Sequence, residues 1–128
     1  MTPIEKQLAE LREKHPSAFT TVANSGATLV SIPEVNLPPG WSMSSVTVLF
    51  VAPPGFPNAQ PDCFWVEPVG LRLGDGGTPQ ATNDSNPIPE FAEHKATWFS
   101  WHLQQWDPIH DSLFTYLKVV MQRLIPPR

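Results

Sequence analysis

Two side chains in the last third of the chain have the types and the spacing that nucleophilic catalysis needs. Ser100 lies two residues before His102. A serine hydroxyl becomes a good nucleophile only when a base removes its proton, and histidine is the usual base near neutral pH. Side chains alternate along extended backbone, so an extended stretch 98–102 would place both on one face. The spacing therefore predicts Ser100 as a candidate catalytic nucleophile with His102 as its base.

A third group would have to orient the base, as in other hydrolytic and acyl-transfer sites. Asp107 or Asp111 could do this, and two further histidines, His94 and His110, lie near them in the sequence. A serine and a histidine two residues apart also occur by chance, so the alternative is that both are ordinary loop residues.

The chain has one cysteine, Cys63, and a thiolate is the best nucleophile that a side chain offers. It is flanked by Phe64 and Trp65, in a run that predicts an inward-facing position on a strand. A buried free cysteine behaves as a small hydrophobic residue, so we expect Cys63 to have a structural role. A single cysteine excludes an internal disulfide and favours a reducing compartment.

No cofactor or metal is expected. The glycine-rich stretch 74–77 lacks the lysine and the serine or threonine of a phosphate-binding loop. The four histidines have no compact spacing with a second cysteine, which argues against a structural zinc site; they are His15, His94, His102 and His110.

Composition sets the class of protein. The chain has 128 residues, 41% of them hydrophobic and 16% charged, and a formal net charge of -4. These values predict a single globular domain over 1–128, with no electrostatic signature of nucleic-acid or membrane binding. The longest apolar runs, such as 46–54, are too short to span a bilayer, and no signal segment is evident. The expected location is the cytoplasm.

The elements around these residues follow from local patterns. Thr2 as N-cap, proline in the first turn and Glu5 three residues on predict a helix that ends near 15–16. Runs of β-branched and apolar residues predict strands over 19–22, 27–32, 45–51 and 62–66.

After these strands, residues 67 to about 97 lose periodicity and predict a long irregular loop. A second helix is expected with Asp107 as N-cap and Pro108 at its first position, with apolar residues at spacings of three and four up to Leu124. The predicted fold is α+β: a helix, about four antiparallel strands, a long loop and a closing helix.

Local motifs then resemble a known family. The segment 50–65, which contains Phe56-Pro57-Asn58-Ala59-Gln60-Pro61, resembles the strand–YPxxxP–strand segment of ubiquitin-conjugating enzymes. Trp106-Asp107-Pro108 resembles the Trp-x-Pro that begins the helix after their active site. The stretches 62–66 and 99–102 are similar to a bacterial branch of that superfamily found with multi-ubiquitin-like proteins and an activating-enzyme homologue. The resemblance covers roughly 20–125.

This resemblance implies a ubiquitin-conjugating-like fold and a carrier for a ubiquitin-like modifier protein, with an activating-enzyme homologue as second partner. The usual catalytic cysteine is missing, which implies an oxyester on Ser100. The asparagine that stabilises the oxyanion also has no counterpart in the loop 69–74. Trp106 and Asp107 would support the site, and antiphage defence is the setting that the bacterial branch implies.

The long loop would hold the glycine-ended tail of the modifier, with Leu71, Leu73 and Trp98 as its contacts, and the activating enzyme would contact the N-terminal helix. Two other functions stay open: a non-catalytic module that binds the modifier or the activating enzyme, and a scaffold whose loop binds something unrelated.

Overall fold

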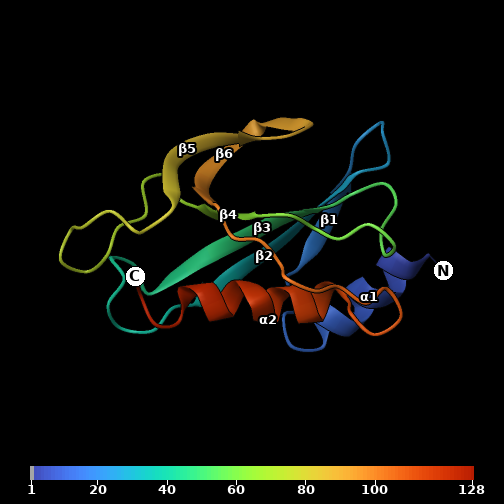
Figure 1. The fold of residues 1–128 in the computed structure, drawn as a ribbon, viewed down its shortest axis with the longest axis horizontal. Coiled ribbons are helices and arrows are strands. Elements are labelled where there is room, and N and C mark those ends of the chain that lie inside the picture. The colour runs from blue at the N-terminus through green and yellow to red at the C-terminus, as the bar shows by residue number, and fades with distance from the viewer. Residues whose placement is uncertain (1) are drawn as a thin grey trace.

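The computed structural model describes residues 2–128, which form one antiparallel sheet with two helices against one of its faces (Figure 1). The strand order is β1-β2-β3-β4-β6-β5, so β1 and β5 are the edges. The elements are α1 (Pro3–Arg12), β1 (Phe19–Val22), β2 (Thr28–Asn36), β3 (Ser45–Ala52), β4 (Phe64–Glu67), β5 (Thr82–Ile88), β6 (Phe91–Phe99) and α2 (Leu113–Leu124).

Helix α1 begins as the sequence predicts. The Glu5 backbone N–H donates to the Thr2 hydroxyl at 3.1 Å, and the Thr2 N–H donates to the Glu5 carboxylate at 3.2 Å. This capping box satisfies two backbone donors that a helix start leaves without partners. The helix ends at Arg12, a few residues earlier than predicted.

Helix α2 begins later than predicted, and Asp107 is not its N-cap. The helix starts at Leu113 with Ser112 as N-cap, in a capping box with Thr115. The Asp107 carboxylate instead accepts the Ile109 N–H at 2.9 Å, which closes a separate turn ahead of the helix. The Asp-Pro pair therefore starts a turn before the helix and not the helix itself, because aspartate caps turns and helices by the same hydrogen bond.

The prediction of about four strands is wrong, because residues 67–97, expected to be a loop, contain β5 and most of β6. Strand β5 has the sequence TNDSNPI and is mostly exposed, so it lacks the apolar alternation that marks a strand. An edge position tolerates its proline, since one side of an edge strand needs no ladder hydrogen bond. Register shifts at Asn83/Asn86 and Pro87/Ile88 further hide the pattern.

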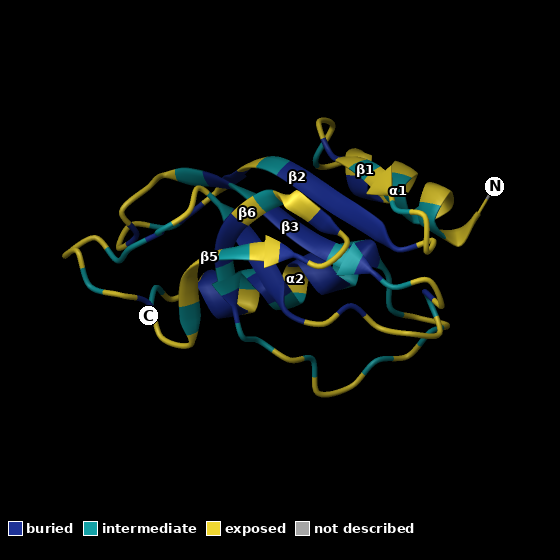
Figure 2. Ribbon diagram, turned by 90° about the horizontal axis from the view of Figure 1, so that it is seen from above, coloured by how far each residue is buried: buried dark blue, intermediate teal, exposed yellow. Residues whose placement is uncertain are grey.

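The sheet has apolar side chains on both faces. On the helix side, Phe50, Phe64 and Phe99 pack with Tyr116 of α2 and with Leu11 of α1. The opposite face carries a smaller cluster under the β5–β6 hairpin, which curls over that face in Figure 1: Ala27, Leu29, Leu49, Trp65, Ile88, Phe91 and Ala96. Figure 2 shows β2 and β3 buried along most of their length, with exposure at the edges.

One buried hydrogen bond ties α2 to the start of β4. The Tyr116 hydroxyl donates to the Cys63 carbonyl oxygen at 2.7 Å, and its side chain is 1% exposed. Burial raises the pKa of Tyr116 well above its usual range, so the hydroxyl stays a donor at all ordinary pH values.

We predict that Tyr116→Phe lowers the free energy of unfolding by about 1–3 kcal/mol, because the Cys63 carbonyl is then buried without a partner. Urea denaturation measures this as a lower midpoint at unchanged slope. Thr21→Val, which removes an exposed hydroxyl from β1, is the control and should change stability by less than about 0.5 kcal/mol. Equal midpoints for wild type and Tyr116→Phe would contradict the assignment.

Candidate functional site

Pairing between β4 and β6 brings together two segments that are far apart in the sequence. Phe64 lies opposite Phe99, and Trp65 lies opposite Trp98. Because the strands are antiparallel, the residues just before β4 must lie beside the residues just after β6. These are Asp62 and Cys63 on one side and Ser100, Trp101 and His102 on the other.

Asp62 orients His102. The Asp62 Oδ1 and the His102 Nδ1 are 2.7 Å apart, with the two side chains 65% and 60% exposed. A carboxylate at Nδ1 holds the ring in one orientation and keeps the proton on that nitrogen, so Nε2 is left free to accept a proton. The sequence had pointed to Asp107 or Asp111 for this role, and the true partner lies 40 residues from the histidine.

Cys63 lies next to this pair but faces the occupied nitrogen. Its Sγ is 3.9 Å from the same His102 Nδ1. The residue precedes β4 with a φ of 60°, so it is not the inward-facing strand residue that the sequence predicted, although it is buried. Since Asp62 already binds Nδ1, the free base nitrogen is not the one that Cys63 contacts.

The surroundings also keep the Cys63 thiol protonated. Burial raises its pKa, and the negative charge of Asp62 raises it further. Hydrogen bonds from the Trp101 backbone and the Trp98 side chain act in the opposite direction but are smaller. The thiol is therefore a poor nucleophile near neutral pH.

Ser100 lies at the end of β6 in a tight turn. Its N–H donates to the Ala81 carbonyl at 2.9 Å, and the next N–H, of Trp101, donates to the Phe99 carbonyl at 3.0 Å. Backbone that closes a three-residue turn is not extended, so strand alternation does not place Ser100 and His102 on one face. Within residues 2–128 the Ser100 hydroxyl has no hydrogen bond to His102 or to any other group.

A cavity of about 450 Å³ lies between the β5–β6 hairpin and strands β3 and β4, beside the Asp62–His102 pair. Trp65 forms part of its wall and carries a buried indole N–H that has no hydrogen-bond partner within residues 2–128. Trp98 lies across the strand pair from it. The wall is formed by Val51, Pro53, Gln60, Asp62, Cys63, Trp65, Asn86, Pro87, Pro89, Glu90 and Trp98.

The three predicted tail contacts do not share a surface. Leu71 is 1% exposed in the helix-side core, because its N–H donates to the Thr97 hydroxyl at 3.0 Å and draws the segment onto the sheet. A buried side chain offers a partner no contact area. Leu73 packs on the same helix-side core and bridges to Trp41. Trp98 packs on the opposite face, beside the cavity.

Trp106 and Asp107 make their contacts away from the Asp62–His102 pair. The Trp106 indole N–H donates to the Pro57 carbonyl at 2.7 Å and its ring packs on Phe56. This fixes the segment between β6 and α2 on the turn after β3. The Asp107 carboxylate binds His110 Nδ1 at 2.6 Å, a second aspartate–histidine pair that is exposed to solvent.

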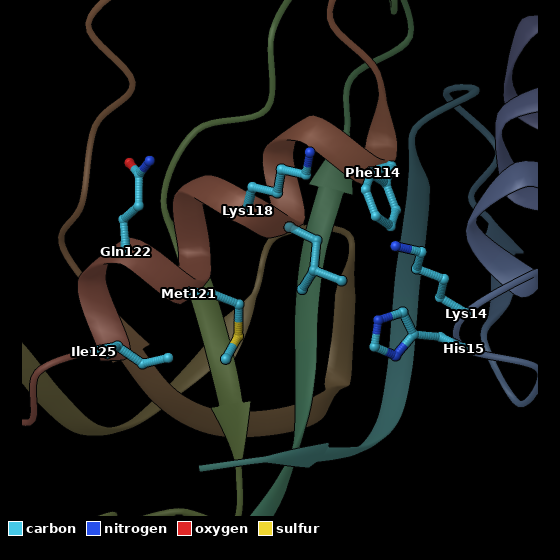
Figure 3. Close-up of a pocket in the computed structure, with 8 residues that line it drawn as sticks. Lys14, His15, Phe114, Lys118, Met121, Gln122 and Ile125 are labelled. Atoms are coloured by element: carbon cyan, nitrogen blue, oxygen red, sulfur yellow. The ribbon is translucent and has the colours of Figure 1, made fainter. Parts of the chain in front are cut away.

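A second cavity lies between the end of α1 and helix α2 (Figure 3). Lys14 and Lys118 lie over the ring of Phe114, with Nζ atoms 5.5 and 5.0 Å from its centroid. Among residues 2–128, the side chains that form its wall include no serine, cysteine or carboxylate, which are groups that acyl transfer needs.

The sheet and the two helices packed on one of its faces define an α+β protein. The model of the family described as Prokaryotic E2 family E matches residues 5–125, so the chain belongs to that family. Membership implies a conjugation-like role, with a ubiquitin-like modifier and an activating enzyme as partners in general terms. No curated protein and no solved structure matches the chain. Across residues 2–128, none of the helices has the length and apolar character to cross a membrane.

The exposed His110 pair gives a prediction on pH. Asp107 raises the pKa of His110 above its ordinary value of 6.5, mainly through their hydrogen bond, and the pKa of Asp107 is lowered in return. The protonated histidine therefore stabilises this turn fully below its ordinary pKa, and the effect is lost as the pH rises through the raised value.

We expect an NMR titration to place the pKa of His110 above the ordinary value and Asp107→Asn to return it. Asp111→Asn is the control and should lower it less, because Asp111 makes the smallest contribution. An unchanged pKa in Asp107→Asn would show that the hydrogen bond does not form in solution.

Proposed function

We propose that this chain accepts the C-terminus of a ubiquitin-like modifier as an oxyester on Ser100 and passes it to a target. The observation that carries the proposal is the 2.7 Å contact between Asp62 and His102, which leaves Nε2 of the histidine free. Ser100 lies two residues before this histidine in the sequence. A base that is already oriented lacks only a hydroxyl to activate. Family membership supports the class of reaction, and the choice of nucleophile is our own inference.

In the loading step, the Ser100 Oγ attacks the carbonyl carbon of the modifier's activated C-terminal glycine. Its proton passes to His102 Nε2 and from there to the activating group, which leaves with the electron pair of the broken bond. In the transfer step His102 Nε2 takes the proton of the acceptor amine or hydroxyl as it attacks the ester carbonyl, and gives that proton to Ser100 Oγ as the ester bond breaks. The Asp62 carboxylate stabilises the imidazolium that forms in between.

This chemistry requires the Ser100 hydroxyl to reach His102 Nε2, a contact that is absent among residues 2–128. The Ser100 side chain is half-buried and its hydroxyl has no hydrogen bond within residues 2–128, so rotation toward the histidine breaks no bond. Catalytic hydrogen bonds are often long or absent in free enzymes and form in the complex with substrate.

The modifier's tail has a suitable place in the cavity beside the pair. A glycine-ended tail is narrow and extended, and the wall of the cavity combines proline and tryptophan side chains with polar ones, among them Gln60 and Asn86. The unpaired Trp65 indole N–H would donate to a backbone carbonyl of the tail, which removes the penalty of a buried donor without a partner. Trp98 remains a contact in this arrangement, and Leu71 does not.

The second candidate function is a non-catalytic module that binds the modifier or its activating enzyme. The observation that favours it is that no hydrogen bond joins Ser100 to His102 within the described residues. The loop 69–74 also has no asparagine to stabilise an oxyanion. Such a module would bind the same partners without forming a bond.

We predict a covalent adduct when the chain is mixed with its activating enzyme, ATP and mature modifier, and intact mass is measured. The adduct should resist thiol reductant, yield to strong base and be absent from Ser100→Ala. His102→Ala should slow its formation by about 10²–10⁴-fold. Cys63→Ala should form it normally.

His110→Ala is the matched control, because His110 also bonds an aspartate through Nδ1 but lies outside the proposed site. It should load at the wild-type rate. An adduct that reductant cleaves and that only Cys63→Ala abolishes would assign the chemistry to the cysteine. Tight binding of either partner with no adduct would establish the non-catalytic module.

A further inference from the structure

Three different metal-ligand types converge at the start of β4. One ligand atom each from Asp62, Cys63 and His102 lies within 4.8 Å of the others. Two of these residues are adjacent in the sequence, and the third arrives from the end of β6. Sequence spacing predicted no zinc site because it compared the histidines with a second cysteine, whereas the fold supplies a carboxylate in its place.

We propose that Asp62, Cys63 and His102 bind a zinc ion, with the fourth position open to water. One sulfur, one nitrogen and one oxygen form a ligand set that zinc accepts in tetrahedral geometry, and three protein ligands with an open position are typical of reactive zinc sites. Ligands such as thiolate and imidazole select zinc over magnesium or calcium.

The distances fit with small adjustments. Bond lengths at tetrahedral zinc place a nitrogen and an oxygen ligand about 3.4 Å apart and a sulfur and a nitrogen about 3.6 Å apart. The present separations are 2.7 Å for Asp62 Oδ1 to His102 Nδ1 and 3.9 Å for Cys63 Sγ to the same nitrogen. Asp62 and His102 are both more than half exposed, so their side chains can make this change.

Cys63 provides the rigid part of the site. Its backbone has a φ of 60°, and its carbonyl is held by the Tyr116 hydroxyl at 2.7 Å. Tyr116 is buried in the helix-side core, so it holds the cysteine backbone from the core side. Asp62 and His102 approach the cysteine from the solvent side. Because Asp62 and His102 are exposed, the ion would reach the cysteine from their side.

Protons are released or moved when the ion binds. The Cys63 thiol gives its proton to solvent and becomes a thiolate ligand. The His102 proton moves from Nδ1 to Nε2, so that Nδ1 can coordinate. The bond between His102 Nδ1 and Asp62 is replaced by two bonds to the metal. Zinc binding does not depend on the proposed transferase function and is measured without it.

The test titrates zinc into reduced, untagged protein in competition with a chromophoric chelator. We expect a single equivalent to bind, and Cys63→Ser and His102→Ala each to weaken binding by about tenfold or more. His110→Ala is the matched control: it removes an exposed histidine with an aspartate partner but no cysteine, and binding should be unchanged. Cobalt in place of zinc should give a thiolate charge-transfer band that Cys63→Ser lacks.

Equal zinc affinity in wild type and His102→Ala would overturn the proposal, as would a cobalt spectrum without the thiolate band. His102 is exposed, so its alanine variant should fold, and circular dichroism checks this for every variant. If the buried Cys63→Ser does not fold, His102→Ala against His110→Ala still decides the question.

Discussion

The antiparallel pairing of β4 with β6 is the constraint on which the rest of the site depends. Phe64 and Phe99 lie opposite each other, and their rings stack with centroids 4.7 Å apart and an interplanar angle of 9°. This contact is buried between the sheet and the helices, so the register is fixed from the core side. A slip of β6 by one residue would turn Phe99 to the other face and move His102 away from Asp62.

Two nitrogens on one imidazole ring then determine what the site can do. Asp62 occupies His102 Nδ1, which leaves Nε2 as a base for Ser100 in the proposed transfer. Zinc on Nδ1 would instead place the proton on Nε2 and remove the base. Cys63 takes part only in the second arrangement, since it lies beside Nδ1 and its raised pKa makes it a poor nucleophile. The two roles therefore exclude each other at any one time.

Local signals predicted local structure well and pairing poorly. The capping box at Thr2 needs only four residues, and the structure has it. Both Asp107 and Ser112 are residue types that serve as helix N-caps, and only the packing of α2 determines that the helix begins after Ser112. The β5–β6 hairpin was missed because the exposed edge strand has polar residues, a proline and bulges. The spacing of Ser100 and His102 made them candidates, but it gave no indication of Asp62 as the partner of His102, because nothing local links residues 40 positions apart. The sequence shows Asp62 only as an aspartate next to the single cysteine. Its position beside His102 follows from the pairing of β4 with β6, and β6 was not predicted.

The most direct measurement of the central claim is the tautomer of His102, read from the side-chain nitrogen signals of ¹⁵N-labelled protein by NMR. Because Asp62 accepts a hydrogen bond at Nδ1, the neutral ring should carry its proton there, with Nε2 unprotonated. Asp62→Asn should remove this preference and leave His110 unchanged. A ring protonated on Nε2 in the wild type, or one that does not respond to Asp62→Asn, would contradict the account of His102 as an oriented base.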